Sequence, residues 1–154
     1  MKRDPALAEL SREHLPALML AYCLRHGRSS NPQYPWPEQP EQQRERVLAF
    51  VRPELARHFE AEECFLLPLK DRLADPGPSE RVRAEHVRFW QLLAQIEAAH
   101  AAGLPLLLMA LGELLEAHIR FEERVWFEQL QQELPPELLA ELGQQLEAFL
   151  GPES

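Results

Sequence analysis

Residues 57–65 read RHFEAEECF, and a second version of this stretch, AHIRFEERV, occupies residues 117–125. Each copy places a histidine four residues before the first glutamate of a Glu-Glu pair. Four residues of an α-helix turn through about 400°, so the imidazole and the carboxylate lie on one face of the helix, about 40° apart. Aromatic and aliphatic neighbours indicate that this face points into a core. The two pairs are His58 with Glu62 and His118 with Glu122.

A histidine and a carboxylate are costly to bury in an apolar core unless something binds both groups. Two such pairs on facing helices have the composition of a two-metal site inside a helix bundle. The repeated stretch therefore predicts a metal centre as well as a helical fold.

The bulk composition is that of one soluble globular domain. The chain has 154 residues, of which 45% are hydrophobic and 27% charged. Its net charge of -9 argues against binding to nucleic acid or to an anionic membrane surface. Residues 1–4 contain no apolar signal segment, and no run is apolar for long enough to span a bilayer. With only two cysteines, Cys23 and Cys64, the sequence predicts a cytoplasmic protein without disulfides.

Leu, Ala, Glu, Gln and Arg dominate the chain and apolar residues rarely alternate, so the sequence predicts an all-α protein. We expect an up-down-up-down four-helix bundle over about 5–133, followed by a packing helix at about 137–150, in a single domain spanning 1–154. Pro16 and Pro53 are expected to kink or restart their helices. The five expected helices cover about residues 5–26, 41–73, 79–102, 105–133 and 137–150.

Residues 27–40, GRSSNPQYPWPEQP, form a predicted loop because they contain four prolines, an Asn-Pro pair and paired serines. Two interpretations of this loop remain open. It is either a spacer between two long helices, or a lid or partner-docking segment that uses Tyr34 and Trp36.

Two further histidines make the pattern symmetric: His14 stands alone on the first helix and His86 alone on the third. A single histidine in an apolar setting is more often an ordinary core residue, but the ordered set favours a metal site. Glu63 and Glu123 are rotated by about 100° from the preceding glutamate, so we expect them either to be exposed or to lie behind the ligands, and we expect their alanine substitutions to be nearly silent. The candidate metal ligands are His14, His58, Glu62, His86, His118 and Glu122.

The order His14 … His58-x-x-x-Glu62 … His86 … His118-x-x-x-Glu122, with the stretches HFEAEECFLLPL and HIRFEERVWFEQL, resembles the hemerythrin-like (HHE cation-binding) domain family. The resemblance covers about residues 5–130. It implies two non-haem iron ions joined by an oxo or hydroxo bridge. His14 and His58 would bind one iron, His86 and His118 the other, and Glu62 and Glu122 would bridge them. Manganese or zinc also suits such a set of imidazoles and carboxylates.

One position departs from the family's pattern. Oxygen-carrying hemerythrins have a second histidine one turn after the lone histidine of the third helix, and here that position is Trp90. Two six-coordinate irons then keep about two open positions, where a carrier keeps one. We therefore expect a small diatomic or peroxide ligand at the metals, with sensing or redox chemistry in place of reversible oxygen carriage. The indole is also expected to add bulk close to the ligand pocket.

The sequence thus predicts a di-iron-binding protein that responds to oxygen, redox state or iron. Two alternatives stay open. One is a di-iron peroxidase or oxidase, for which Tyr34 and Glu85 are weak candidate proton donors. The other is a metal-free helical interaction module. Nothing in the sequence identifies a protein partner or decides whether the protein is an enzyme.

Overall fold

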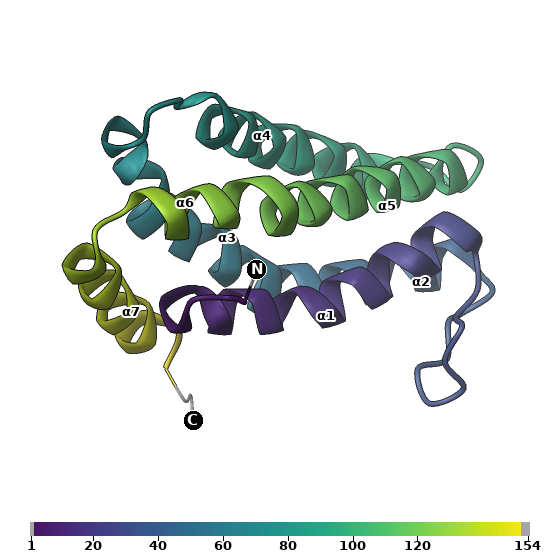
Figure 1. Cartoon of the computed structure of the whole chain (residues 1–154). Helices are drawn as coiled ribbons and strands as arrows, with labels where there is room; N and C mark the ends of the chain where they lie inside the picture. The colour runs from purple at the N-terminus through teal and green to yellow at the C-terminus, as the bar shows by residue number, and fades with distance from the viewer. Residues whose placement is uncertain (1, 152–154) are drawn as a thin grey trace.

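Every regular element that the structure describes is a helix. The computed structural model describes residues 2–151, and four long helical stretches run alternately up and down in it (Figure 1). The first stretch is α1 (Pro5–His26) and the third is α4 (Gly77–Ala98). The second stretch consists of α2 (Pro40–Phe50), η1 (Val51–Leu55), α3 (Ala56–Ala61), η2 (Glu62–Leu66) and η3 (Leu67–Arg72). The fourth consists of α5 (Leu104–Phe121), η4 (Glu122–Trp126) and α6 (Phe127–Glu133).

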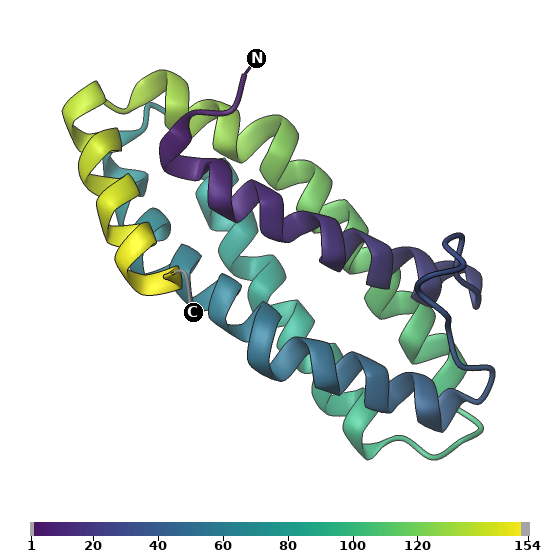
Figure 2. The same ribbon diagram turned by 90° about the horizontal axis from the view of Figure 1, so that it is seen from below.

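The predicted helix after the bundle is α7 (Pro136–Leu150), which crosses one end of the bundle beside α1 and α3 (Figure 2). One face of α7 is apolar and buried, as its leucine spacing predicts. The buried residues of this face are Leu139, Leu142, Leu146 and Leu150. The all-α fold with four bundle helices and one additional helix is therefore confirmed.

Local signals explain where the first helix begins and ends. The side chain of Asp4 accepts a hydrogen bond from the Ala6 N–H, and Pro5 occupies the first turn, where its missing N–H costs nothing. Gly27 ends the helix with a φ of 71°, a conformation that favours glycine. The helix continues through Pro16 without a break. The third helix ends at Ala98, a few residues before the predicted end.

Three segments, η1, η2 and η4, are π-helical, with N–H groups that donate to the carbonyl five residues back. In η1 the wider turn accommodates Pro53, which has no N–H of its own. The other two begin at Glu62 and at Glu122. The backbone at these two glutamates keeps α-helical dihedral angles, with φ and ψ of -64° and -41° at Glu62 and -60° and -45° at Glu122.

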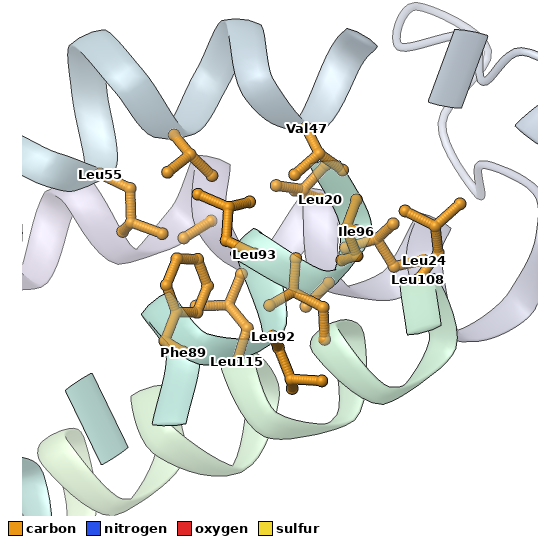
Figure 3. Packing of buried hydrophobic residues seen from close by; sticks show 14 of the residues in the cluster. Leu20, Leu24, Val47, Leu55, Phe89, Leu92, Leu93, Ile96, Leu108 and Leu115 are labelled. Atoms are coloured by element: carbon orange, nitrogen blue, oxygen red, sulfur yellow. The ribbon is translucent and has the colours of Figure 1, made fainter. Parts of the chain in front are cut away.

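The interior holds two apolar clusters. One packs α1, α2, α4 and α5 together and includes Leu20, Val47 and Leu93 (Figure 3). The other joins the start of α1, the segment after Glu62, α6 and α7, and it contains Trp126, whose indole N–H donates to Ser79 Oγ at 2.8 Å. The polar residues of the candidate site lie along the bundle between the two clusters.

The loop between α1 and α2 lies at the end of the bundle away from α7 (Figure 1). Its aromatic rings Tyr34 and Trp36 hold the guanidinium of Arg46 at 5.0 and 5.4 Å, and Trp36 also packs on the first apolar cluster. Helix α1 runs for about 18 Å beyond His14 before the loop begins. The loop therefore lies away from the histidines, and its roles as a spacer, a lid or a partner-docking segment stay predictions. Within residues 2–151, no helix is long and apolar enough to cross a membrane.

Candidate metal centre

Four histidines and two glutamates, one or two from each helical stretch, meet inside the bundle. All are buried: the two glutamates are 0% exposed and the histidines at most 3%. Their ligand atoms form two groups, in each of which the atoms lie within 4.8 Å of one another. Both groups contain Glu62 and Glu122. The first group adds His14 and His58, and the second adds His86 and His118.

Each buried carboxylate divides its two oxygens between the two histidine pairs. One oxygen of each glutamate lies against an Nε2 atom of the first group, and the other oxygen against an Nε2 atom of the second. The contacts Glu62–His58, Glu62–His86, Glu122–His14 and Glu122–His118 measure 3.0, 3.0, 2.9 and 2.9 Å. A carboxylate in this position can bind two metal ions at once.

Two of these contacts lack a hydrogen bond although their atoms are close. His58 Nε2 and Glu62 Oε2 are buried without a hydrogen-bond partner, and so are His118 Nε2 and Glu122 Oε2. Buried polar atoms are rarely left in this state, because losing water without a replacement partner is costly. A cation between the two atoms of each pair would satisfy both of them. The donor set and its unpaired atoms therefore fit a pair of metal ions.

A second layer of four carboxylates holds the outer nitrogens of the histidines. Because a carboxylate only accepts, each contact places the proton on Nδ1 and turns Nε2 toward the centre. Going round the bundle, each helical stretch supplies a glutamate to the histidine of the next stretch, and the fourth returns to the first. The pairs are Glu13–His58, Glu63–His86, Glu85–His118 and Glu123–His14, with Nδ1 to oxygen distances of 2.8, 2.8, 2.8 and 2.6 Å.

Arginines back three of these outer glutamates. The pairs are Glu13 with Arg57 at 3.8 Å, Glu85 with Arg81 at 2.9 Å and Glu123 with Arg3 at 3.0 Å. Glu63 differs: in the part of the chain that the structure describes, no arginine or lysine nitrogen lies within 4.0 Å of it, and its side chain is 45% exposed. Three of the outer glutamates are thus held by ion pairs, and the fourth, Glu63, faces solvent.

Proton affinities in the site follow from these contacts. Burial lowers the pKa of His58, but the negative charge of Glu62 and the hydrogen bond to Glu13 outweigh burial and raise the pKa to about 10. His118 responds in the same way to burial and to Glu122, and its pKa also rises to about 10. Burial raises the pKa of Glu122, but the histidines beside it hold that pKa well below its ordinary value. Without metal, protons hold the imidazoles and carboxylates together.

Aromatic rings shield the histidines. Phe59 stacks on His86 with ring centroids 4.0 Å apart, and Phe127 stacks on His14 at 5.6 Å. Trp90 is 36% exposed and meets Phe59 edge-on at 5.9 Å. The ring that adds bulk beside the histidines is therefore Phe59, and the indole lies at the surface of the bundle.

Sequence reasoning did not assign the outer carboxylates to particular histidines. Glu63 and Glu123 lie outside the central set, as predicted, but each accepts a hydrogen bond from a histidine, so we expect their alanine substitutions to weaken metal binding. Each lies about 100° round the helix from the preceding ligand, and its side chain reaches a histidine of a neighbouring stretch, as those of Glu13 and Glu85 do from regular α-helices. A signal for the other two was present in the sequence, because each lone histidine directly follows a glutamate, Glu13 or Glu85. Glu85 is held by His118 and an arginine, which lower its pKa against the opposite effect of burial.

The comparisons with known proteins give one match. The family model described as the hemerythrin HHE cation binding domain matches residues 6–130. This range contains all six predicted ligands and all four outer glutamates, and it stops before α7. No curated protein and no solved structure gives a significant match.

Proposed function

The chain belongs to the hemerythrin HHE cation-binding domain family, and from this premise we propose that it binds two iron ions and acts as an oxygen-, redox- or iron-responsive protein. One observation carries the proposal: two buried carboxylates each divide their oxygens between two pairs of imidazole Nε2 atoms. In this proposal Glu62 and Glu122 bridge the ions. His14 and His58 bind one ion, and His86 and His118 bind the other.

The donor chemistry supports iron. Imidazole nitrogens and carboxylate oxygens suit iron, and they also suit manganese and zinc, whereas a calcium or magnesium site would be dominated by oxygen ligands. Both cysteines lie outside the two ligand groups. A bound iron pair supplies one-electron redox chemistry and positions for small ligands such as oxygen, nitric oxide or peroxide.

The protein's own residues prepare the site for this role. The outer glutamates keep the proton on each Nδ1, which orients the rings and leaves Nε2 for the metal. Phe59 and Phe127 cover two of the imidazoles and keep water away from them. Because the histidines come from all four helical stretches, the bundle holds their relative positions before metal arrives.

Metal analysis tests the site. Protein loaded with ferrous iron without air, then desalted, is expected to hold close to two ions per chain. Glu62→Ala and Glu122→Ala each remove a contact to both groups, so each is expected to lower occupancy more than His14→Ala does. Glu60→Ala, an exposed glutamate on α3, serves as the matched control. If the protein is folded but binds no metal, the metal-free helical interaction module is the function that remains.

Exposure to air tests the responsive role. We expect oxygen to convert the anaerobically reduced protein to the di-ferric form rapidly, and argon not to reverse the change. Reversible uptake of oxygen would identify a carrier. Steady turnover of peroxide with a reductant, lost in Glu122→Ala, would identify an enzyme.

A further inference from the structure

The open side of the site leads into a cavity. Between η3 and α4 lies a space of about 430 Å³, which has His86 and Glu63 among its lining residues. This volume falls within the range of small-molecule sites. On this side the bundle lacks the arginine that backs each of the other three outer glutamates.

The walls of the cavity are largely apolar. Leu67 and Pro68 line one side, and Val87 and Trp90 line the other. Trp90 is 36% exposed and Val87 49%, although both are large and hydrophobic. An aromatic or aliphatic body placed between these side chains would bury apolar surface that the folded chain leaves in water.

Two cations without partners also line this space. Lys70 comes from η3 and Arg83 from α4, and neither has a carboxylate within 4.0 Å among residues 2–151. Two carboxylates line the cavity as well: Glu63, whose oxygen is held by His86 Nδ1, and Glu80. Neither of these carboxylates lies within 4.0 Å of Lys70 or Arg83. An anionic group placed beside the two cations would supply the ion-pair partner that they lack.

We propose that this cavity binds a small aromatic carboxylate next to His86. The carboxylate pairs with Lys70 and Arg83, and the ring packs on Trp90 and Pro68. A hydroxyl group at the far end of the ring can donate to Glu63, which has a free oxygen. The proposal does not depend on the identity of the metal, because the lining residues are formed in the protein alone.

The test uses 3-(4-hydroxyphenyl)propanoate as the probe and full-length, 15N-labelled, metal-free protein. The chain has three tryptophans, and each gives one indole N–H signal. Trp36 lies at the far end of the bundle and serves as the internal reference. The indole N–H of Trp126 donates to Ser79 Oγ, and Ser79 lines the cavity, so the Trp126 signal is not used as a reference. We expect the Trp90 signal to shift and saturate as the probe is added, while the Trp36 signal stays in place.

Matched ligands and variants decide the chemistry. Tyramine carries an ammonium group in place of the carboxylate and is expected to bind at least about fivefold more weakly. Arg83→Gln is expected to weaken binding of the probe by about fivefold, as expected for one partly exposed ion pair. Arg88 lies on the same helix but outside the cavity, so Arg88→Gln is expected to leave the affinity for the probe unchanged. A Trp90 signal that does not saturate, equal binding of tyramine, or equal losses in the two arginine variants would overturn the proposal.

Discussion

At the scale of single residues, the outer glutamates determine how the histidines are presented. Each one fixes the tautomer and the orientation of an imidazole that comes from another helical stretch. Carboxylates in this position raise the basicity of a ligating histidine, and their loss typically weakens metal binding by about 10- to 100-fold. The four outer glutamates are thus part of the site, although none of them belongs to the two central groups.

Substitution of Glu123 tests this role. Glu123→Ala removes the acceptor for His14 Nδ1, so we expect metal affinity to fall by about 10-fold or more. Glu123→Gln keeps an acceptor oxygen, so its metal affinity is expected to fall less than that of Glu123→Ala. Glu113→Ala replaces an exposed glutamate on the same helical stretch and serves as the control. Competition with a chelator of known affinity measures the change, and equal affinities for Glu123→Ala and the control would contradict the role.

At the scale of helices, α1 and α5 approach closely because Gly112 has no side chain. A Cβ atom at this position would lie 2.7 Å from Leu24 Cβ and 3.0 Å from the Ala21 carbonyl oxygen. The Ala21 oxygen belongs to the backbone, which cannot swing aside as the end of a side chain can. The two helices that carry His14 and His118 are therefore held together at a distance that only glycine allows.

We expect Gly112→Ala to destabilise the fold by about 1–3 kcal/mol, the usual cost of overpacking. The gain in helix propensity, about 1 kcal/mol, opposes this loss without cancelling it. Gly103→Ala is the control, because a Cβ there meets nothing within 4 Å. Urea denaturation of the metal-free proteins measures the free energy of unfolding of both variants. A Gly112→Ala protein as stable as the wild type would show that α1 and α5 move apart at little cost.

At the scale of the whole molecule, the protonated histidines stabilise the metal-free fold. The pKa of His58 and of His118 rises from an ordinary value of 6.5 to about 10 on folding. A raised pKa means that folding favours the protonated form, so this contribution is fully present below about pH 6.5 and is lost as the pH rises toward 10. The pKa of Glu122 is lowered, so its contribution is lost in acid, below its ordinary value of 4.5. The metal-free protein is therefore expected to lose stability between pH 6.5 and pH 9, in urea denaturation with a chelator present. If the stability rises over this range, protonation of His58 and His118 does not stabilise the metal-free fold.

Metal and protons compete for the same nitrogens. At pH 7.5 we expect metal binding to release protons, because His58 and His118 are protonated before the metal arrives. Calorimetric titration with zinc in two buffers of different ionisation enthalpy gives the number released. The competition extends to about pH 10, well above the value of 6.5 for a free imidazole. A binding enthalpy that does not change with the buffer would show that the imidazoles are neutral beforehand.

Bound metal is also expected to stabilise the fold, by an amount that grows with its concentration above the dissociation constant. Because protons already pair the metal-free site, the difference between loaded and metal-free protein should be small near pH 6 and larger near pH 9. Melting curves at both values check this. An equal difference at the two values would mean that protons do not substitute for the metal.

The sequence by itself determined the fold class, the five helices and the six residues that meet at the centre. These inferences rest on local geometry: four residues of helix bring a histidine and a glutamate to one face, and proline and glycine mark the helix ends. The repetition of the pattern also showed that the two halves supply matching sets of side chains. The division of Glu62 and Glu122 oxygens between the two histidine pairs is the geometry that the family resemblance implies.

Only the tertiary structure decided which carboxylate holds which histidine. Glu13 and His58 lie on different helical stretches, and their contact depends on how those stretches cross and on the rotation of each about its own axis. The placement of the helical stretches also leaves the side at Glu63 open. Arginines reach the other three outer glutamates, and among the described residues none reaches Glu63.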